Sequence, residues 1–221
     1  VTFYYIIVNT GLQMIIGFFV AYLLYWHGQG TRLLRPVLLI PMLIPPVVVG
    51  LSWRVLFTPD LGGINYFLSV VGINAPDWLS QPHTALIGVT VASVWEWTPF
   101  VMLVLLAGLE SLPTDPIESA EIDGANQLQL IRLVILPLLQ PVLFVVVILR
   151  VIEALGILPV VFMMTGGGPA QATEAINLYA YEVGFSFLDI AYASSLLVVF
   201  IFIVLLFSVP FVLGTMRGDT R

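Results

Sequence analysis

Five long apolar runs constrain the fold of this chain more than any other feature. Each run is close to the roughly 20 residues that an α-helix needs to cross the hydrocarbon core of a bilayer. Backbone amides find no water there, so a spanning segment must close its hydrogen bonds within itself, as a helix does. The chain is therefore predicted to be an all-α polytopic membrane protein, with spans at 3–26, 36–57, 84–109, 137–163 and 191–214.

The composition supports a membrane protein and excludes several other classes. Apolar residues make up 60% of the chain and charged residues only 9%, against about 25% charged in soluble domains. The net charge of −6 argues against a nucleic-acid partner, which requires a basic surface. There is no Cys, no Lys, no HExxH and no GxSxG, so neither an enzyme nor a nucleotide-binding loop is expected. His27 and His83 are isolated in the sequence, so no metal site is expected either.

The arginines outside the spans predict the orientation. The loops at 58–83 and 164–190 contain no Lys or Arg, whereas the other side carries five arginines. Basic loops remain in the cytoplasm, so the segment 110–133 and the C-terminus are predicted to be cytoplasmic in a bacterial or archaeal inner membrane. The first residue would then lie outside, and we expect an upstream helix to precede it. The five arginines are Arg32, Arg35, Arg132, Arg217 and Arg221.

Prolines interrupt two of the spans. The second span contains Pro41, Pro45 and Pro46, and the fourth contains Pro141 and Pro159. Spanning helices tolerate proline where neighbouring helices or water satisfy the freed backbone groups. The prolines therefore indicate either broken helices around a polar path or simple kinks with a packing role.

Charged residues near the centres of the third and fourth spans form one candidate functional site. Glu96, Arg150 and Glu153 would be costly in hydrocarbon, so they should face the interior of the bundle or water. Arg150 and Glu153 are three residues apart and share a helix face. One interpretation is a solute path, in which carboxylates accept hydroxyl hydrogen bonds and Trp95 or Trp97 stacks on a sugar ring. The alternatives are a structural ion network or contacts to a partner permease.

An acidic island separates the third and fourth spans. Asp115 is a possible N-cap, Glu118 stands where a capping-box acid reaches back, and Asp123-Gly124 allows a sharp turn. A helix hairpin at 113–133 is therefore predicted against the membrane. Lipid-binding interfacial helices are typically basic, so a protein partner bearing arginines suits this surface better than a membrane does. An ordinary loop between helices is the alternative.

These residues carry a resemblance to a known family. Glu118-x-Ala120-x-x-Asp123-Gly124-Ala125, followed by Leu136-Pro137, resembles the cytoplasmic loop of binding-protein-dependent ABC importer permeases. A second group of motifs is similar to the outer loop of the carbohydrate, maltose-permease-like branch. These are Gly166-Gly167-Gly168-Pro169, Ala172-Thr173-Glu174 and Tyr179-Ala180-Tyr181.

The resemblance implies a mechanism and a set of partners. The chain 1–221 would be a single, N-terminally truncated permease domain, with about five spans of a six-helix core and a coupling loop at 113–133. A separate ATPase dimer would bind ATP and seat the hairpin, with Glu118 paired to an ATPase arginine. A second permease subunit would complete the pore, and membrane lipid would surround it. An extracytoplasmic solute-binding protein would dock at Gly166–Pro169 and deliver a sugar for inward transport.

A different class of function remains open. The chain could be a self-sufficient secondary transporter or channel that uses Glu96, Arg150 and Glu153 for proton or ion coupling. The acidic hairpin distinguishes the two hypotheses, because a secondary carrier has no need of a helix hairpin shaped to a partner.

Overall fold

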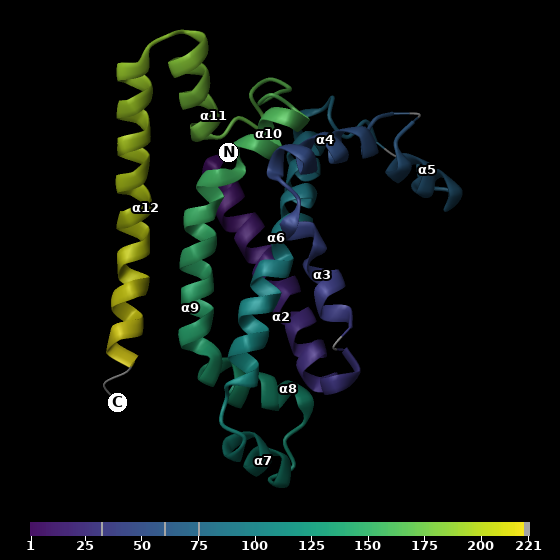
Figure 1. Cartoon of the computed structure of the whole chain (residues 1–221), viewed down its shortest axis with the longest axis vertical. Coiled ribbons are helices and arrows are strands. Elements are labelled where there is room, and N and C mark those ends of the chain that lie inside the picture. Colours follow the sequence, from purple (N-terminus) through teal and green to yellow (C-terminus); the bar gives the residue numbers. More distant parts are fainter. Residues whose placement is uncertain (32, 60, 75, 219–221) are drawn as a thin grey trace.

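The described residues form a bundle of helices, seen in Figure 1. The computed structural model describes residues 1–31, 33–59, 61–74 and 76–218. Arg32 and Arg221, two of the arginines that predict the orientation, lie outside them. The helices are α1 (Thr2–Tyr4), the π-helical η1 (Tyr5–Asn9), α2 (Thr10–His27), the 3-10 segment η2 (Gly28–Thr31), α3 (Leu34–Leu43), α4 (Pro46–Leu56), α5 (Gly63–Val70), α6 (Pro82–Glu110), α7 (Asp115–Ile122), α8 (Gln127–Gln129), the π-helical η3 (Leu130–Ile135), α9 (Leu136–Glu153), the 3-10 segment η4 (Ala154–Ile157), α10 (Leu158–Met164), α11 (Ile176–Tyr181), the π-helical η5 (Glu182–Ser186) and α12 (Ile190–Gly218).

Three continuous helical stretches are long and apolar enough to cross a membrane. They are Thr2–His27, Pro82–Glu110 and Gln127–Glu153, and they confirm the first, third and fourth predicted spans. The fourth prediction was wrong at both ends: the helix begins ten residues earlier, and 158–163 belongs to the separate helix α10. The apolar run continues through the 3-10 segment η4, so hydropathy alone gave no sign of the break.

The second predicted span is broken at its prolines, the first of the two alternatives given above. α3 and α4 meet at a 95° bend, and the pair adds one more candidate span if it is counted as a single crossing. Ile44 and Pro45 are extended there, with ψ of 130° and 136°. A residue that precedes proline is disfavoured in the helical region, and Ile44 and Pro45 both precede one. Pro41 and Pro141, in contrast, remain inside continuous helices, α3 and α9.

The fifth predicted span coincides with α12. This helix covers Ile190–Gly218, of which Ile190–Leu205 is an apolar helix shorter than a full span by itself. α12 packs against α9 and α11, and Figure 1 shows it running from the level of α11 toward the end of the molecule that carries α7.

The two ends of the bundle carry different elements. We name the end that carries α7 and α8 the hairpin end, and the end that carries α10 and α11 the loop end (Figure 1). α4 packs on α10 at the loop end. Arg54, on α4, is exposed and donates a hydrogen bond to the carbonyl of Met163 at 3.3 Å. The sequence interpretation placed this arginine inside a span, so the loop end carries one basic residue that the predicted orientation did not count.

Close packing of α2 on α6 forms the centre of the bundle. Gly17 makes this contact possible, because a Cβ at that position would lie 2.7 Å from Val101 Cγ1 and 3.2 Å from the Met102 nitrogen. Small residues at such points let spanning helices approach closely, where dispersion replaces the hydrophobic effect as the driving force.

Two apolar cores lie along the bundle, one toward each end. The core near the hairpin end includes Val101, Leu105 and Leu139. The core near the loop end includes Tyr5, Val89 and Val161. The first and third spans each change from one core to the other along their length, whereas the fourth span contributes only to the core near the hairpin end. Apart from Thr90, the buried polar residues of these spans cluster between the two cores, and we call this cluster the polar layer: Asn9, Thr10, Gln13, Ser93, Glu96 and Arg150.

Candidate functional site

The hairpin is anchored to the bundle by its apolar side. Ile117 on α7 is buried and belongs to the same core as Leu130 and Ile135 of η3. Ala120 packs against that core and, like Ala125, is partly buried. A displacement of the hairpin would therefore move the ends of the spans that share this core.

The turn of the hairpin is a glycine-dependent helix C-terminus. Gly124 has φ +82°, a left-handed conformation that side chains with a Cβ adopt at a cost. The Ala125 amide donates to the Ala120 carbonyl, and the Gly124 amide to the Glu121 carbonyl, both at 3.0 Å. This pair of bonds is the Schellman motif, so the sharp turn predicted at this glycine is present.

The predicted cap of α7 was wrong. The N-cap is Thr114, which has a helical backbone and makes no side-chain capping bond, and Asp115 lies in the first turn. A capping box occurs instead at α8: the Asn126 amide donates to Gln129 Oε1 at 2.9 Å, and the Gln129 amide donates to Asn126 Oδ1 at 3.0 Å. The Asn-x-x-Gln spacing was readable in the sequence and was missed.

The outer face of the hairpin combines acids with apolar side chains. Glu118, Glu121 and Asp123 are exposed, and two large apolar neighbours are also exposed, Ile122 at 86% and Leu128 at 72%. Exposed apolar residues rimmed by charges are typical of a protein interface. The other predicted coupling residues, Ala120 and Ala125, face partly inward.

Hydrogen bonds in the polar layer join the first, third and fourth spans. Arg150 Nε donates to Gln13 Oε1 at 2.9 Å. Gln13 Nε2 donates to the Ser93 carbonyl at 3.2 Å, and Asn9 Nδ2 donates to Ser93 Oγ at 3.1 Å. Glu96 and Arg150 are 1% and 3% exposed. The sequence interpretation named these two charges but missed Asn9, Gln13 and Ser93, although Asn9 and Gln13 are four residues apart inside an apolar run.

Arg150 is held by an amide and a ring rather than by a carboxylate. Its Cζ lies 4.6 Å from the centre of the Trp97 ring, which is a cation–π distance. Within the described residues the one ion pair is Arg35–Glu110 at 2.7 Å, between α3 and α6. Arg150 therefore forms no direct ion pair with Glu96 or Glu153, and the alternative of a directly bonded ion network is not realised in this conformation.

Three polar atoms of the layer face a very small cavity. Asn9 Oδ1, Glu96 Oε2 and Arg150 Nη1 are buried and have no hydrogen-bond partner in the structure. All three residues line a cavity of about 20 Å³, together with Trp97 and Glu153. Such a volume holds about one water molecule, so no sugar passes the polar layer in this conformation.

The Gly166–Pro169 segment begins a compact loop at the loop end. Gly166 and Gly167 have φ of +59° and +86°. Gly166 is exposed, Gly168 and Pro169 are partly buried, and Gly167 is buried. Leu178 packs closely on Gly167, since a Cβ added there would lie 3.1 Å from Leu178 Cδ2. Exposed Ala170 and Gln171 follow, with φ of +48° and +60°. The accessible surface of the loop is thus centred on 170–171 as much as on the glycines.

Thr173 holds this loop on the bundle. Its side chain is fully buried; its Oγ1 lies 2.7 Å from Thr165 Oγ1 and donates to the Gly168 carbonyl at 2.9 Å. The Tyr5 hydroxyl donates to the Thr173 carbonyl at 3.5 Å. Nearby, burial and the charge of Glu182 raise the pKa of Glu174 above that of a free glutamate. The loop therefore has a fixed shape before any partner binds.

Metal ligation has no candidate site in the part of the chain that the structure covers. Across 1–31, 33–59, 61–74 and 76–218, no three His, Cys, Asp or Glu side chains gather closely enough to hold an ion.

Comparisons with known proteins agree on one family. Residues 13–215 match the family "Binding-protein-dependent transport system inner membrane component". The chain is 37% identical to the "Probable ABC transporter permease protein y4oQ" of Sinorhizobium fredii, over 99% of this chain and 70% of that protein. It is 35% identical to the trehalose/maltose transport system permease protein MalF of Thermococcus litoralis, over 99% and 74% respectively.

A solved bacterial ABC transporter involved in alginate import has the same fold, with a TM-score of 0.77 and 24% identity over 96% of this chain and 77% of that one. A methionine ABC transporter, MetNI, matches with a TM-score of 0.69 and 22% identity over 100% of this chain and 93% of that one. The chain therefore belongs to the family of binding-protein-dependent transport system inner membrane components, which are permease components of ABC importers and not enzymes.

Proposed function

We propose that this chain is the transmembrane subunit of an ABC importer that carries a sugar or related polyhydroxy solute inward. Residues 1–221 would act as one permease domain, paired with a second permease subunit in the membrane. The relative from Thermococcus litoralis, which this chain matches over almost its whole length, is named for trehalose and maltose transport. Trehalose and maltose are both disaccharides, so this relationship supports a carbohydrate as the solute.

The acidic hairpin is the observation that carries this proposal. Glu118, Asp123 and Gly124 are exposed at the hairpin end, while Ile117 ties the same helix to the apolar core. An ATPase dimer would seat the hairpin on its cytoplasmic side, and Glu118 would pair with an ATPase arginine. Closure of the dimer on ATP would then pull on the core through Ile117. In this orientation the segment 110–133 and the C-terminus face the cytoplasm.

The polar layer is the proposed solute path. Glu96, Trp97, Arg150 and Glu153 would line it once the spans move apart. Asn9 Oδ1, Glu96 Oε2 and Arg150 Nη1 have no hydrogen-bond partner in the structure, and their residues line one cavity. Sugar hydroxyls could donate to the two oxygens and accept from the guanidinium. The cavity of about 20 Å³ corresponds to the closed state of this path.

The loop end is the proposed docking face for an extracytoplasmic solute-binding protein. Gly166, Gly167, Gly168 and Pro169 shape the loop, and its fixed hydrogen bonds reduce the ordering cost of docking. A self-sufficient secondary carrier is the weaker hypothesis, since the family is defined by dependence on a binding protein and a carrier leaves the hairpin without a role.

The test uses the absence of natural cysteine. A Glu118→Cys variant labelled with a maleimide-benzophenone should photo-cross-link to the ATPase subunit when the complex is prepared in membranes with ATP. Ile15→Cys, exposed on α2 and labelled in the same way, is the matched control and should not cross-link to the ATPase. A Glu118→Cys variant that never captures an ATPase subunit, although membrane insertion is normal, would contradict the assigned role of the hairpin.

A further inference from the structure

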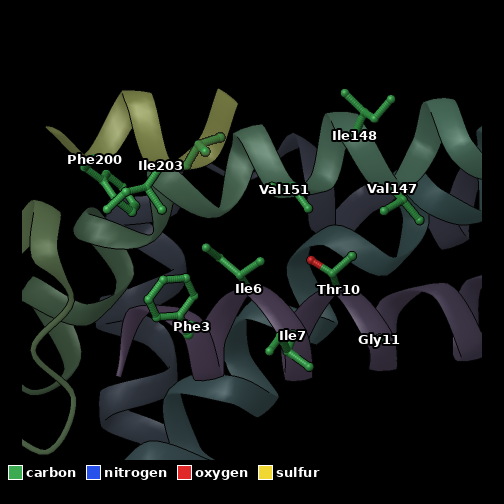
Figure 2. Close-up of a pocket in the computed structure, with 11 residues that line it drawn as sticks. Phe3, Ile6, Ile7, Thr10, Gly11, Val147, Ile148, Val151, Phe200 and Ile203 are labelled. Atoms are coloured by element: carbon green, nitrogen blue, oxygen red, sulfur yellow. The ribbon is translucent and has the colours of Figure 1, made fainter. Parts of the chain in front are cut away.

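A second, larger cavity lies between the first span, α9 and α12 (Figure 2). Its volume is about 300 Å³. In Figure 2, Ile6 and Thr10 point from the first span toward Val147 and Val151 of α9, and Phe200 of α12 lies at one side. This cavity is separate from the proposed solute path, although Thr10 lies in the wall of both.

The wall of this cavity is hydrocarbon. Of the lining residues, Thr10 alone has a polar side chain, and the others are Phe, Ile, Val and Gly. The volume corresponds to about ten waters at their share of liquid volume, but each buried water needs two to four polar partners. One hydroxyl cannot supply them. The cavity therefore suits an apolar occupant.

The dimensions leave no room for a whole helix inside the cavity. A helix with its side chains is about 10 Å across, so even two turns need more space than about 300 Å³. A flexible hydrocarbon chain fits. Gly11 widens the cavity, because a Cβ added there would meet no atom within 4 Å.

The cavity is open at the surface of the bundle. Of its lining residues, Phe3 and Ile7 are 54% and 69% exposed, whereas Phe200 and Val204 on α12 are buried. Ile6 and Ile7 belong to the π-helical segment η1, and such departures from α-helical geometry are frequent at functional sites. In a bilayer the molecules that reach this edge are lipids, and their tails match the wall.

We propose that this cavity is a binding site for one acyl chain of a membrane lipid. The chain would enter past Phe3 and Ile7 and fill the space between the first span and α12. It would support the packing of α12, which contacts α9 and α11 and lines this cavity together with the first span. The site goes beyond the proposed transport function, because it concerns the lipid requirement of the fold and not the solute.

The test is photo-cross-linking to a phosphatidylglycerol that carries a diazirine on its acyl chain, with the full chain in phosphatidylethanolamine/phosphatidylglycerol vesicles. The proposal expects label on the peptides that contain Phe3–Gly11 and Val147–Val151. Gly11→Phe should fill the cavity and reduce that label by about tenfold. Ile15→Phe, on the exposed side of the same helix, should leave the label unchanged.

Two outcomes would overturn the proposal. The first is equal labelling of these peptides in Gly11→Phe and in the parent chain, because equal labelling is expected from ordinary contact with bulk lipid. The other is capture of a protein, and not a lipid, by a photoreactive amino acid placed at Ile7, which would identify a partner side chain as the occupant. Circular dichroism and size-exclusion profiles identical to the parent chain would show that Gly11→Phe is folded.

Discussion

The Nε of Arg150 donates a hydrogen bond to Oε1 of Gln13 at 2.9 Å, across 137 residues of sequence. The bond joins the fourth span to the first within the polar layer, where apolar packing is interrupted. A movement that opens a path between these spans must break this bond or carry both residues together. The same arginine stacks on Trp97 of α6, so one side chain connects three spans.

Replacement of Gln13 by Leu should destabilise the protein by about 2 kcal/mol, because it leaves the buried Arg150 without its amide acceptor. The apparent melting temperature in detergent is the measurement. Gln13→Glu keeps an acceptor for the guanidinium but loses the donor to the Ser93 carbonyl, so it should lose less stability than Gln13→Leu. Equal loss in both variants would show that the bond to Arg150 contributes nothing.

Reversal of charge at Glu118 should uncouple transport while the chain still inserts into the membrane. Glu118→Lys removes the acid that we expect to pair with an ATPase arginine, at a cost of about 2–5 kcal/mol in ATPase association. Glu121→Lys, an exposed neighbour on the same helix, should have a smaller effect. Normal association and uptake in Glu118→Lys would refute the pairing.

The turn at Gly124 should depend on backbone conformation and not on side-chain volume. Its φ is +82° and a Cβ there would meet open space, so Gly124→Ala should cost about 1 kcal/mol of local stability. Gly124→Asn should cost less, because Asn tolerates the left-handed region. Hydrogen exchange of the Ala125 amide, which closes the turn, reports the difference. Faster exchange in the Asn variant than in the Ala variant would contradict this account.

The outer loop should be probed at Gln171 and not at its glycines. Gly167 is buried against Leu178, so a bulky replacement there would disturb the fold. Gln171 is exposed and already has a positive φ. Gln171→Trp should reduce stimulation of the partner ATPase by loaded binding protein several-fold, whereas Gln171→Ala and basal ATPase activity should change little. Unreduced stimulation in Gln171→Trp would mean that docking lies elsewhere.

The sequence predicted those features that depend on local pattern. Apolar runs of spanning length identified the spanning helices, and the prolines of the second span indicated either a break or a kink there. The glycine after Asp123 identified the turn. The prediction of the α7 N-cap was wrong because Asp115 and Thr114 are both plausible caps. The choice between them depends on how Ile117 packs on η3.

Long-range partnerships were beyond the sequence. Nothing in the apolar run around Gln13 indicates that its amide meets Arg150, because that contact depends on how three helices pack. The alternative of a structural ion network would pair Arg150 with Glu96 or Glu153, whereas the fold supplies an amide and a ring. The apolar cavity beside Thr10 likewise arises from the placement of α12 and has no motif.

Uptake of a labelled disaccharide into vesicles tests the central claim most directly. The vesicles would contain the complex of this chain with its second permease and ATPase, with binding protein present on the outer side. The account predicts accumulation that requires both ATP hydrolysis and the binding protein and that survives dissipation of the proton gradient. Accumulation by this chain without the ATPase, driven by an ion gradient and abolished by Glu96→Gln, would contradict it.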